Sequence, residues 1–154
     1  MFLRACVILI GIVVLAFMLG EPQFEGRNTH ASFLQIYFND PFLAYAYIAS
    51  IPFFIALYQA FRLLGYIAKS QVFTLNFVRA LRTIKHCSLA LITFISAAEA
   101  YLFIGGGGSD DIAGGVAMGV FLIFVSSIMA TAAVIFEQLL QSAIDIRSEH
   151  DLTM

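Results

Sequence analysis

Long apolar stretches alternate with short polar ones along the whole chain. A bilayer has a hydrocarbon core about 30 Å thick, and a helix needs roughly 20 apolar residues to cross it. Four stretches have about that length, and in chain order they cover residues 3–20, 41–67, 87–104 and 114–136. The pattern predicts four membrane-spanning helices.

The segment before the third stretch, residues 68–86, has a different pattern. Its apolar and basic residues recur at helical spacing on opposite faces, and Thr74 is suited to cap the N-terminus of the helix. One face carries Phe77, Ala80, Leu81 and Ile84, and the other carries Arg79, Arg82 and Lys85. A helix of this kind lies along an anionic membrane surface or under a partner. Residues 137–154 are also amphipathic, so the fourth helix is predicted to extend beyond the membrane into a polar tail.

Composition supports a membrane protein. The 154 residues are 61% hydrophobic and 12% charged, whereas a soluble domain is about half apolar and about a quarter charged. The length leaves room for a single domain, residues 1–154. The first stretch follows Arg4, as the apolar part of a signal peptide would. It is long for such a peptide and ends without a good cleavage site, so we interpret it as a retained span, with cleavage as the alternative.

The basic residues predict the orientation. Cytoplasmic loops carry an excess of Lys and Arg. With the N-terminus inside the cell, seven of the eight Lys and Arg residues are cytoplasmic, and only Arg27 is outside. The expected fold class is therefore all-α, an integral membrane four-helix bundle with both termini in the cytoplasm, a cytoplasmic amphipathic helix before the third span and a cytoplasmic extension of the fourth.

Both predicted cytoplasmic segments carry a recognisable sequence. Residues 73–84 (FTLNFVRALRTI) and 137–154 (EQLLQSAIDIRSEHDLTM) resemble those of a bacterial family of small four-span membrane proteins, domain of unknown function 2975, the YoaS-like membrane proteins. Asn76 stands one position before the usual Asn of the family, where this chain has Phe77, and His150 replaces the amide that usually precedes Asp-Leu-Thr. The resemblance implies a bacterial cytoplasmic membrane protein whose gene lies beside that of a small helix-turn-helix transcription regulator.

The resemblance and the charges together predict a docking surface on the cytoplasmic face. A regulatory or scaffolding protein would hold the helix-turn-helix regulator there and would not itself contact nucleic acid. The docking candidates are Arg79, Arg82, Lys85, Glu149, Asp151 and Leu152. The alternative is that the basic residues only fix orientation and contact anionic lipid of the bilayer, each contributing about 1 kcal/mol. The sequence leaves the oligomeric state open, and a homo-oligomer is compatible with it.

Glu99 is the acidic residue that lies well inside an apolar stretch, and it is the intramembrane polar candidate. Inserting a charged side chain at the centre of a membrane helix costs about 2.5–3.5 kcal/mol on insertion scales, so such a residue is a candidate for a functional role. We expect a structural hydrogen bond between helices, with Tyr45, Tyr47, Ser50 and Ser126 as candidate partners. The alternative is small-molecule or ion transport through Glu99. Gly115 and Gly119 on the fourth span have the small-xxx-small spacing that allows close helix approach.

Catalytic and metal-binding patterns are missing from the sequence. Cys6 and Cys87 lack the spacing of a redox or zinc pair, and the glycine run 105–108 lacks the Lys and Ser/Thr of a phosphate loop. We therefore expect no enzyme activity, no cofactor, no catalytic residue and no metal site.

Overall fold

Four long helices make up the part of the chain that the structure, a computed structural model, describes: residues 1–24, 41–105 and 112–153. They are α1 (Phe2–Phe24), α3 (Pro41–Ala68), α4 (Leu75–Gly105) and α5 (Ile112–Thr153). Each is long and apolar enough to cross a membrane, which confirms the prediction of an all-α protein with four spans. The aromatic segment 33–38, which the sequence predicts to be either a short interfacial helix or an aromatic anchor for the second span, lies outside the described residues.

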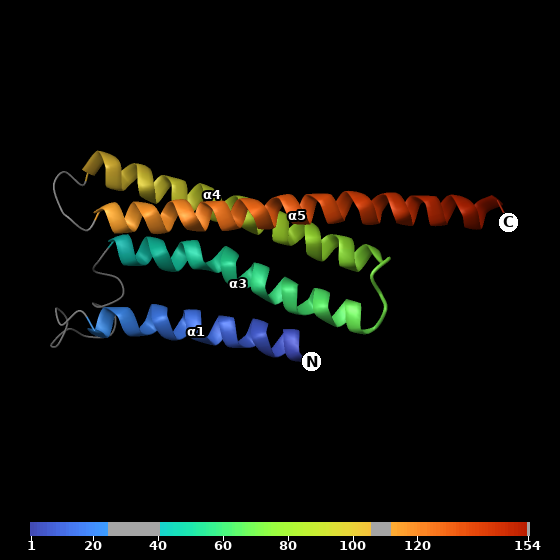
Figure 1. The fold of residues 1–154 in the computed structure, drawn as a ribbon, viewed down its shortest axis with the longest axis horizontal. Coiled ribbons are helices and arrows are strands. Elements are labelled where there is room, and N and C mark those ends of the chain that lie inside the picture. Colours follow the sequence, from blue (N-terminus) through green and yellow to red (C-terminus); the bar gives the residue numbers. More distant parts are fainter. Residues whose placement is uncertain (25–40, 106–111, 154) are drawn as a thin grey trace.

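The helices run antiparallel in sequence order (Figure 1). α5 packs against α4, α4 packs against α3, and α1 packs against α3. The start of α1, the α3–α4 connection and the end of α5 therefore lie at the same end of the bundle. We call it the basic end, because it carries Arg4, Arg62, Lys69, Arg79, Arg82, Lys85 and Arg147. That this end faces the cytoplasm stays a prediction from the charges.

The connection between α3 and α4 is closed by backbone geometry at both helix ends. Ser70 has a φ of 56°, and the amides of Ser70 and Gln71 donate to carbonyls in the last turn of α3 at 3.1 and 2.8 Å. This pairing is the Schellman ending of a helix. Thr74 Oγ1 accepts from the amide of Phe77 at 3.4 Å, as an N-cap does. The two ends hold α3 and α4 in a tight antiparallel pair.

The amphipathic segment is the first part of α4. The helix runs from Leu75 into the membrane without a break, because no Gly or Pro interrupts the sequence at its junction with the apolar stretch. Its apolar face is covered from within the chain. Phe77, Val78 and Leu81 form a buried cluster with Leu140 of α5, and Leu63, Tyr66, Val72 and Ile144 pack around it. The prediction of an apolar face opposite a basic one is confirmed, since Arg79 and Arg82 are exposed.

Candidate docking surface at the basic end

Glu137 joins the basic face of α4 to α5. Its Oε1 accepts from Arg82 Nε at 2.8 Å, and its Oε2 accepts from Lys85 Nζ at 2.9 Å. The two cations are three residues apart and therefore lie on the same face of α4. The Glu137 side chain is only 13% exposed, whereas that of Arg82 is 54% exposed. We call these three residues the Glu137 clasp, which holds the first half of α4 against α5 just beyond the predicted fourth span.

The clasp changes the acid–base behaviour of its carboxylate. The hydrogen bond from Lys85, followed by that from Arg82, holds the pKa of Glu137 below its ordinary value of 4.5. A carboxyl group whose pKa is lowered on folding stabilises the folded state above its unfolded pKa. That contribution is lost as the pH falls through the lowered value. The clasp is therefore complete at neutral pH and opens only in acid below pH 4.5.

The clasp divides the predicted docking residues into two groups. Arg82 and Lys85 bind Glu137 within the chain, so their charges are partly neutralised. The Arg79 side chain is exposed on α4. Glu149, Asp151 and Leu152 lie on the last turns of α5. Glu149 is 12 residues beyond Glu137, or about 18 Å of helix rise, so the fold does not bring the acidic candidates to the basic ones.

The last part of α5 projects from the bundle. Residues 145–153 are helical, and every one of them is exposed. In Figure 1 this segment extends well past the other helices. Its apolar side chains are among the most exposed in the chain, with Ile146 at 67% and Leu152 at 84%. We call residues 145–153 the α5 tip.

Glu137 and Ile146 are residues of this surface that are absent from the sequence-derived docking candidates. The sequence feature that points to Glu137 is a carboxylate at the membrane boundary of the fourth helix, together with two cations, Arg82 and Lys85, on one face of the helix before it. The sequence does not show that α5, rather than lipid or a partner, lies beside this face of α4.

Glu99 lies against α5 at Gly119. A Cβ atom built on Gly119 would stand 2.8 Å from Glu99 Cδ and 3.1 Å from its Cγ, and Gly119 is buried. The helices approach closely here, as the small-xxx-small spacing predicts. Glu99 Oε1 is buried and has no hydrogen-bond partner among the described residues.

The hydroxyl groups expected to bind Glu99 donate elsewhere. Tyr45 donates to the carbonyl of Phe94 at 2.7 Å, and Tyr47 donates to that of Met18 at 2.7 Å. Ser50 donates to the carbonyl of Tyr47 at 2.6 Å. The expected hydrogen bond between helices is therefore not formed by these three groups.

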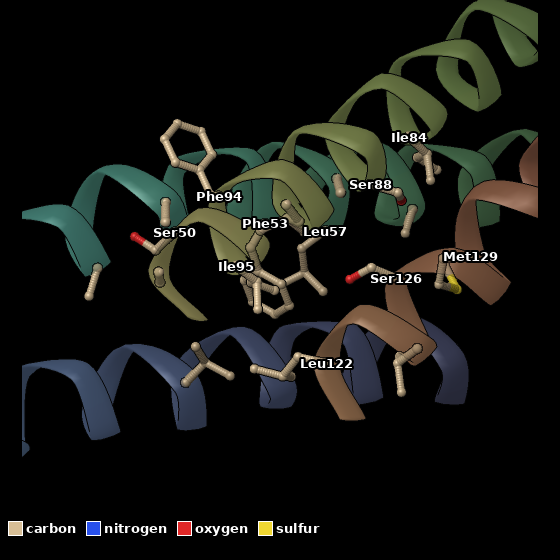
Figure 2. A pocket seen from close by; sticks show the side chains of 18 of the residues that line it. Ser50, Phe53, Leu57, Ile84, Ser88, Phe94, Ile95, Leu122, Ser126 and Met129 are labelled. Atoms are coloured by element: carbon tan, nitrogen blue, oxygen red, sulfur yellow. The ribbon is translucent and has the colours of Figure 1, made fainter. Parts of the chain in front are cut away.

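An apolar cavity of about 580 Å³ lies between the helices. Side chains from all four helices line it, among them Val14, Phe53, Leu57, Ile95, Ser126 and Met129. Figure 2 shows Phe53, Leu57, Ile95 and Ser126 converging on this space. Among the described residues, no group of three or more His, Cys, Asp or Glu side chains could hold a metal ion.

The fold and the exposed apolar surface of its spans define a multi-pass α-helical membrane protein. The chain belongs to the family described as "Protein of unknown function (DUF2975)", whose profile matches residues 25–154. It is also 37% identical over 154 residues to "Uncharacterized membrane protein YoaS" of Bacillus subtilis (strain 168), covering 99% of this chain and 96% of that protein. No solved structure matches the chain. The family and this relative place the protein in the cell membrane as a multi-pass protein of unknown function.

Proposed function

We propose that the protein is a membrane-bound regulatory partner that docks a soluble cytoplasmic protein through the α5 tip. The observation that carries the proposal is the exposure of Ile146 and Leu152 on a helix that projects past the rest of the bundle. A polar tail needs no such side chains to stay in water. Exposed apolar side chains on a helix commonly serve as anchors in a groove of a partner. Ile146 and Leu152 are six residues apart, about 120° apart around the helix, so they supply two separate anchors rather than one apolar face.

The charges of the tip suit a basic partner. Glu149 and Asp151 are exposed, and neither forms an ion pair within the described part of the chain. Complementary charge speeds encounter and favours the right partner more than it adds affinity. A small helix-turn-helix regulator, which must present a basic surface to DNA, fits this chemistry. In this proposal the basic surface of the regulator binds either DNA or the α5 tip, and the membrane protein itself has no enzyme activity.

A photo-crosslinking amino acid placed in the full chain tests this docking in cells. We expect a crosslink to a small helix-turn-helix regulator when the probe replaces Leu152 or Ile146. The control position is Phe121, which is 60% exposed on the membrane-spanning part of α5 and should crosslink to lipid. The proposal fails if Leu152 and Ile146 yield the same products as Phe121.

A second candidate function, ion or proton transport, is supported by Glu99. Its buried Oε1 without a hydrogen-bond partner is the kind of group that a proton or cation could bind. In proteoliposomes with an imposed pH gradient, this function requires that Glu99→Gln slow proton flux at least tenfold. Glu149→Gln is the matched control, because that carboxylate is exposed at the α5 tip. Equal flux through the two variants, or no flux through the unmodified chain, would remove transport at Glu99.

A further inference from the structure

The apolar cavity lies within the membrane-spanning part of the bundle. On α3 its lining runs from Tyr45 to Ala60, about 22 Å of helix rise. Its volume of about 580 Å³ falls in the range of about 300–1,000 Å³ that is typical of ligand pockets. Its polar lining groups are the hydroxyls of Tyr45, Ser50, Ser88 and Ser126. A water molecule needs two to four polar partners to be stable in a cavity, so water does not suit most of this space.

The helices leave the cavity a side that can face the bilayer. α1 packs against α3, and α5 packs against α4, whereas α1 and α5 form no comparable interface. Val14 of α1 and Leu122 of α5 line the cavity from these two outer helices. A hydrocarbon chain from the surrounding bilayer therefore has a direct approach between them.

An unpaired cation lies beyond the basic end of this cavity. The Arg4 guanidinium carbon is 5.0 Å from the centre of the Phe61 ring, next to Ala60, where the cavity lining on α3 ends. The same guanidinium contacts Gly65, and a Cβ atom there would overlap it. Gly65 is five residues past Ala60, or about 7.5 Å of helix rise. Arg4 is thus held by α3 at the depth where the apolar span ends.

Within the described residues, Arg4 has no acidic partner. The carboxylate that forms ion pairs there is Glu137, and its partners are Arg82 and Lys85. Arg4 Nε is buried and has no hydrogen-bond partner in that part of the chain. Burying a charge is costly unless another group compensates it, and the cation–π contact with Phe61 supplies only part of that compensation. A lipid phosphate is an anion found at this depth of a membrane.

We propose that the cavity binds one anionic phospholipid, with an acyl chain between α1 and α5 and the phosphate paired with Arg4. The apolar cavity lies toward the centre of the bilayer and Arg4 lies toward its surface, as the acyl chain and the phosphate of a phospholipid do. The site is separate from the α5 tip, so this inference stands independently of the proposed docking function.

The first test measures lipid retention by native mass spectrometry on the full chain in detergent. The purified protein is delipidated and titrated with phosphatidylglycerol, and separately with phosphatidylcholine of the same acyl chains. We expect one tightly bound phosphatidylglycerol per chain, with about fivefold preference over phosphatidylcholine, since one basic residue near the surface contributes about 1 kcal/mol to anionic-lipid binding. Arg4→Gln should abolish the preference, whereas Arg62→Gln should keep it, because Arg62 is exposed and donates to Tyr66.

The second test fills the cavity. Ala56 lines it, so Ala56→Phe should weaken binding of either lipid at least tenfold. Ala100→Phe is the matched control, because Ala100 is exposed on α4 and lies outside the lining. Ala49→Leu fills the same cavity with a smaller side chain and serves if Ala56→Phe does not fold by circular dichroism.

Three results would overturn the proposal. One is the absence of a retained phospholipid on the unmodified chain. Another is equal lipid binding by Ala56→Phe and Ala100→Phe. If Ala56→Phe does not fold, the comparison is between Ala49→Leu and Ala100→Phe. The third is a bound mass that corresponds to a quinone or to a second copy of the chain, which would assign the cavity to a different occupant.

Discussion

Replacing Glu137 by Gln is expected to destabilise the basic end by about 2 kcal/mol. A hydrogen bond to a charged group contributes about 1.5–3 kcal/mol, but the Arg82 side chain is 54% exposed, and exposed pairs contribute only about 0–1 kcal/mol. Most of the loss therefore comes from Lys85, whose side chain is 23% exposed and loses its counter-charge. Amide hydrogen exchange over residues 75–86 should become about 30-fold faster, which is the equivalent of 2 kcal/mol.

The control for this prediction is Glu149→Gln, which removes an exposed carboxylate from the same helix. It should leave exchange over residues 75–86 unchanged. In the unmodified chain, residues 75–86 should lose their protection from amide exchange as the pH falls below 4.5, the ordinary pKa of Glu137. In Glu137→Gln the protection of these residues should not change in this pH range. Equal exchange rates in the two variants at neutral pH would show that the clasp does not hold α4 to α5.

Replacing Gly119 by Ala is expected to destabilise the α4–α5 contact by about 1 kcal/mol, the low end of the usual cost of overpacking, because the atoms in the way belong to the flexible side chain of Glu99. The new methyl group would overlap the Glu99 carboxyl group, which must move or separate the helices. Thermal unfolding in detergent measures the loss. Gly114→Ala is the matched control, since nothing lies within 4 Å of its added Cβ. That change should be neutral or slightly stabilising, because Ala is the better helix former.

A double-mutant cycle shows whether Glu99 causes the loss. In a Glu99→Ala background the carboxyl group is gone, so Gly119→Ala should cost much less than it does alone. An additive result would mean that Gly119 acts through a contact other than Glu99. Equal stability of the Gly119→Ala and Gly114→Ala proteins would contradict the close approach itself.

The spans and faces of the helices could be predicted from the sequence because they depend on local periodicity. The run 114–136 has the length of a bilayer crossing, and the spacing of Phe77, Leu81 and Ile84 identifies one buried face. Thr74 caps α4 as its residue type and position predict. These features need no knowledge of which helix lies beside which.

The contacts between helices could not be predicted in this way. The amphipathic pattern shows that a face of α4 is covered, but the same pattern fits lipid, a partner or α5. Likewise, the sequence suggests hydroxyl partners for Glu99 only because their residues lie at a similar depth in the membrane. Tyr45 instead donates to the carbonyl of Phe94, and Glu99 lies against Gly119. Such pairings depend on helix rotation and register, which the periodicity of one helix does not fix.

The α5 tip is the proposed docking element, and a binding measurement tests it most directly. The full chain and a chain ending at Ile144 are placed in identical nanodiscs and titrated with a purified small helix-turn-helix regulator, the partner class that the family resemblance implies. Ile144 packs in the cluster with α4, so the truncation removes none of the residues of that cluster and we expect the bundle to stay intact. We expect binding to the full chain and at least tenfold weaker binding to the truncated one. Equal affinity for both chains, or no binding to either, would contradict it.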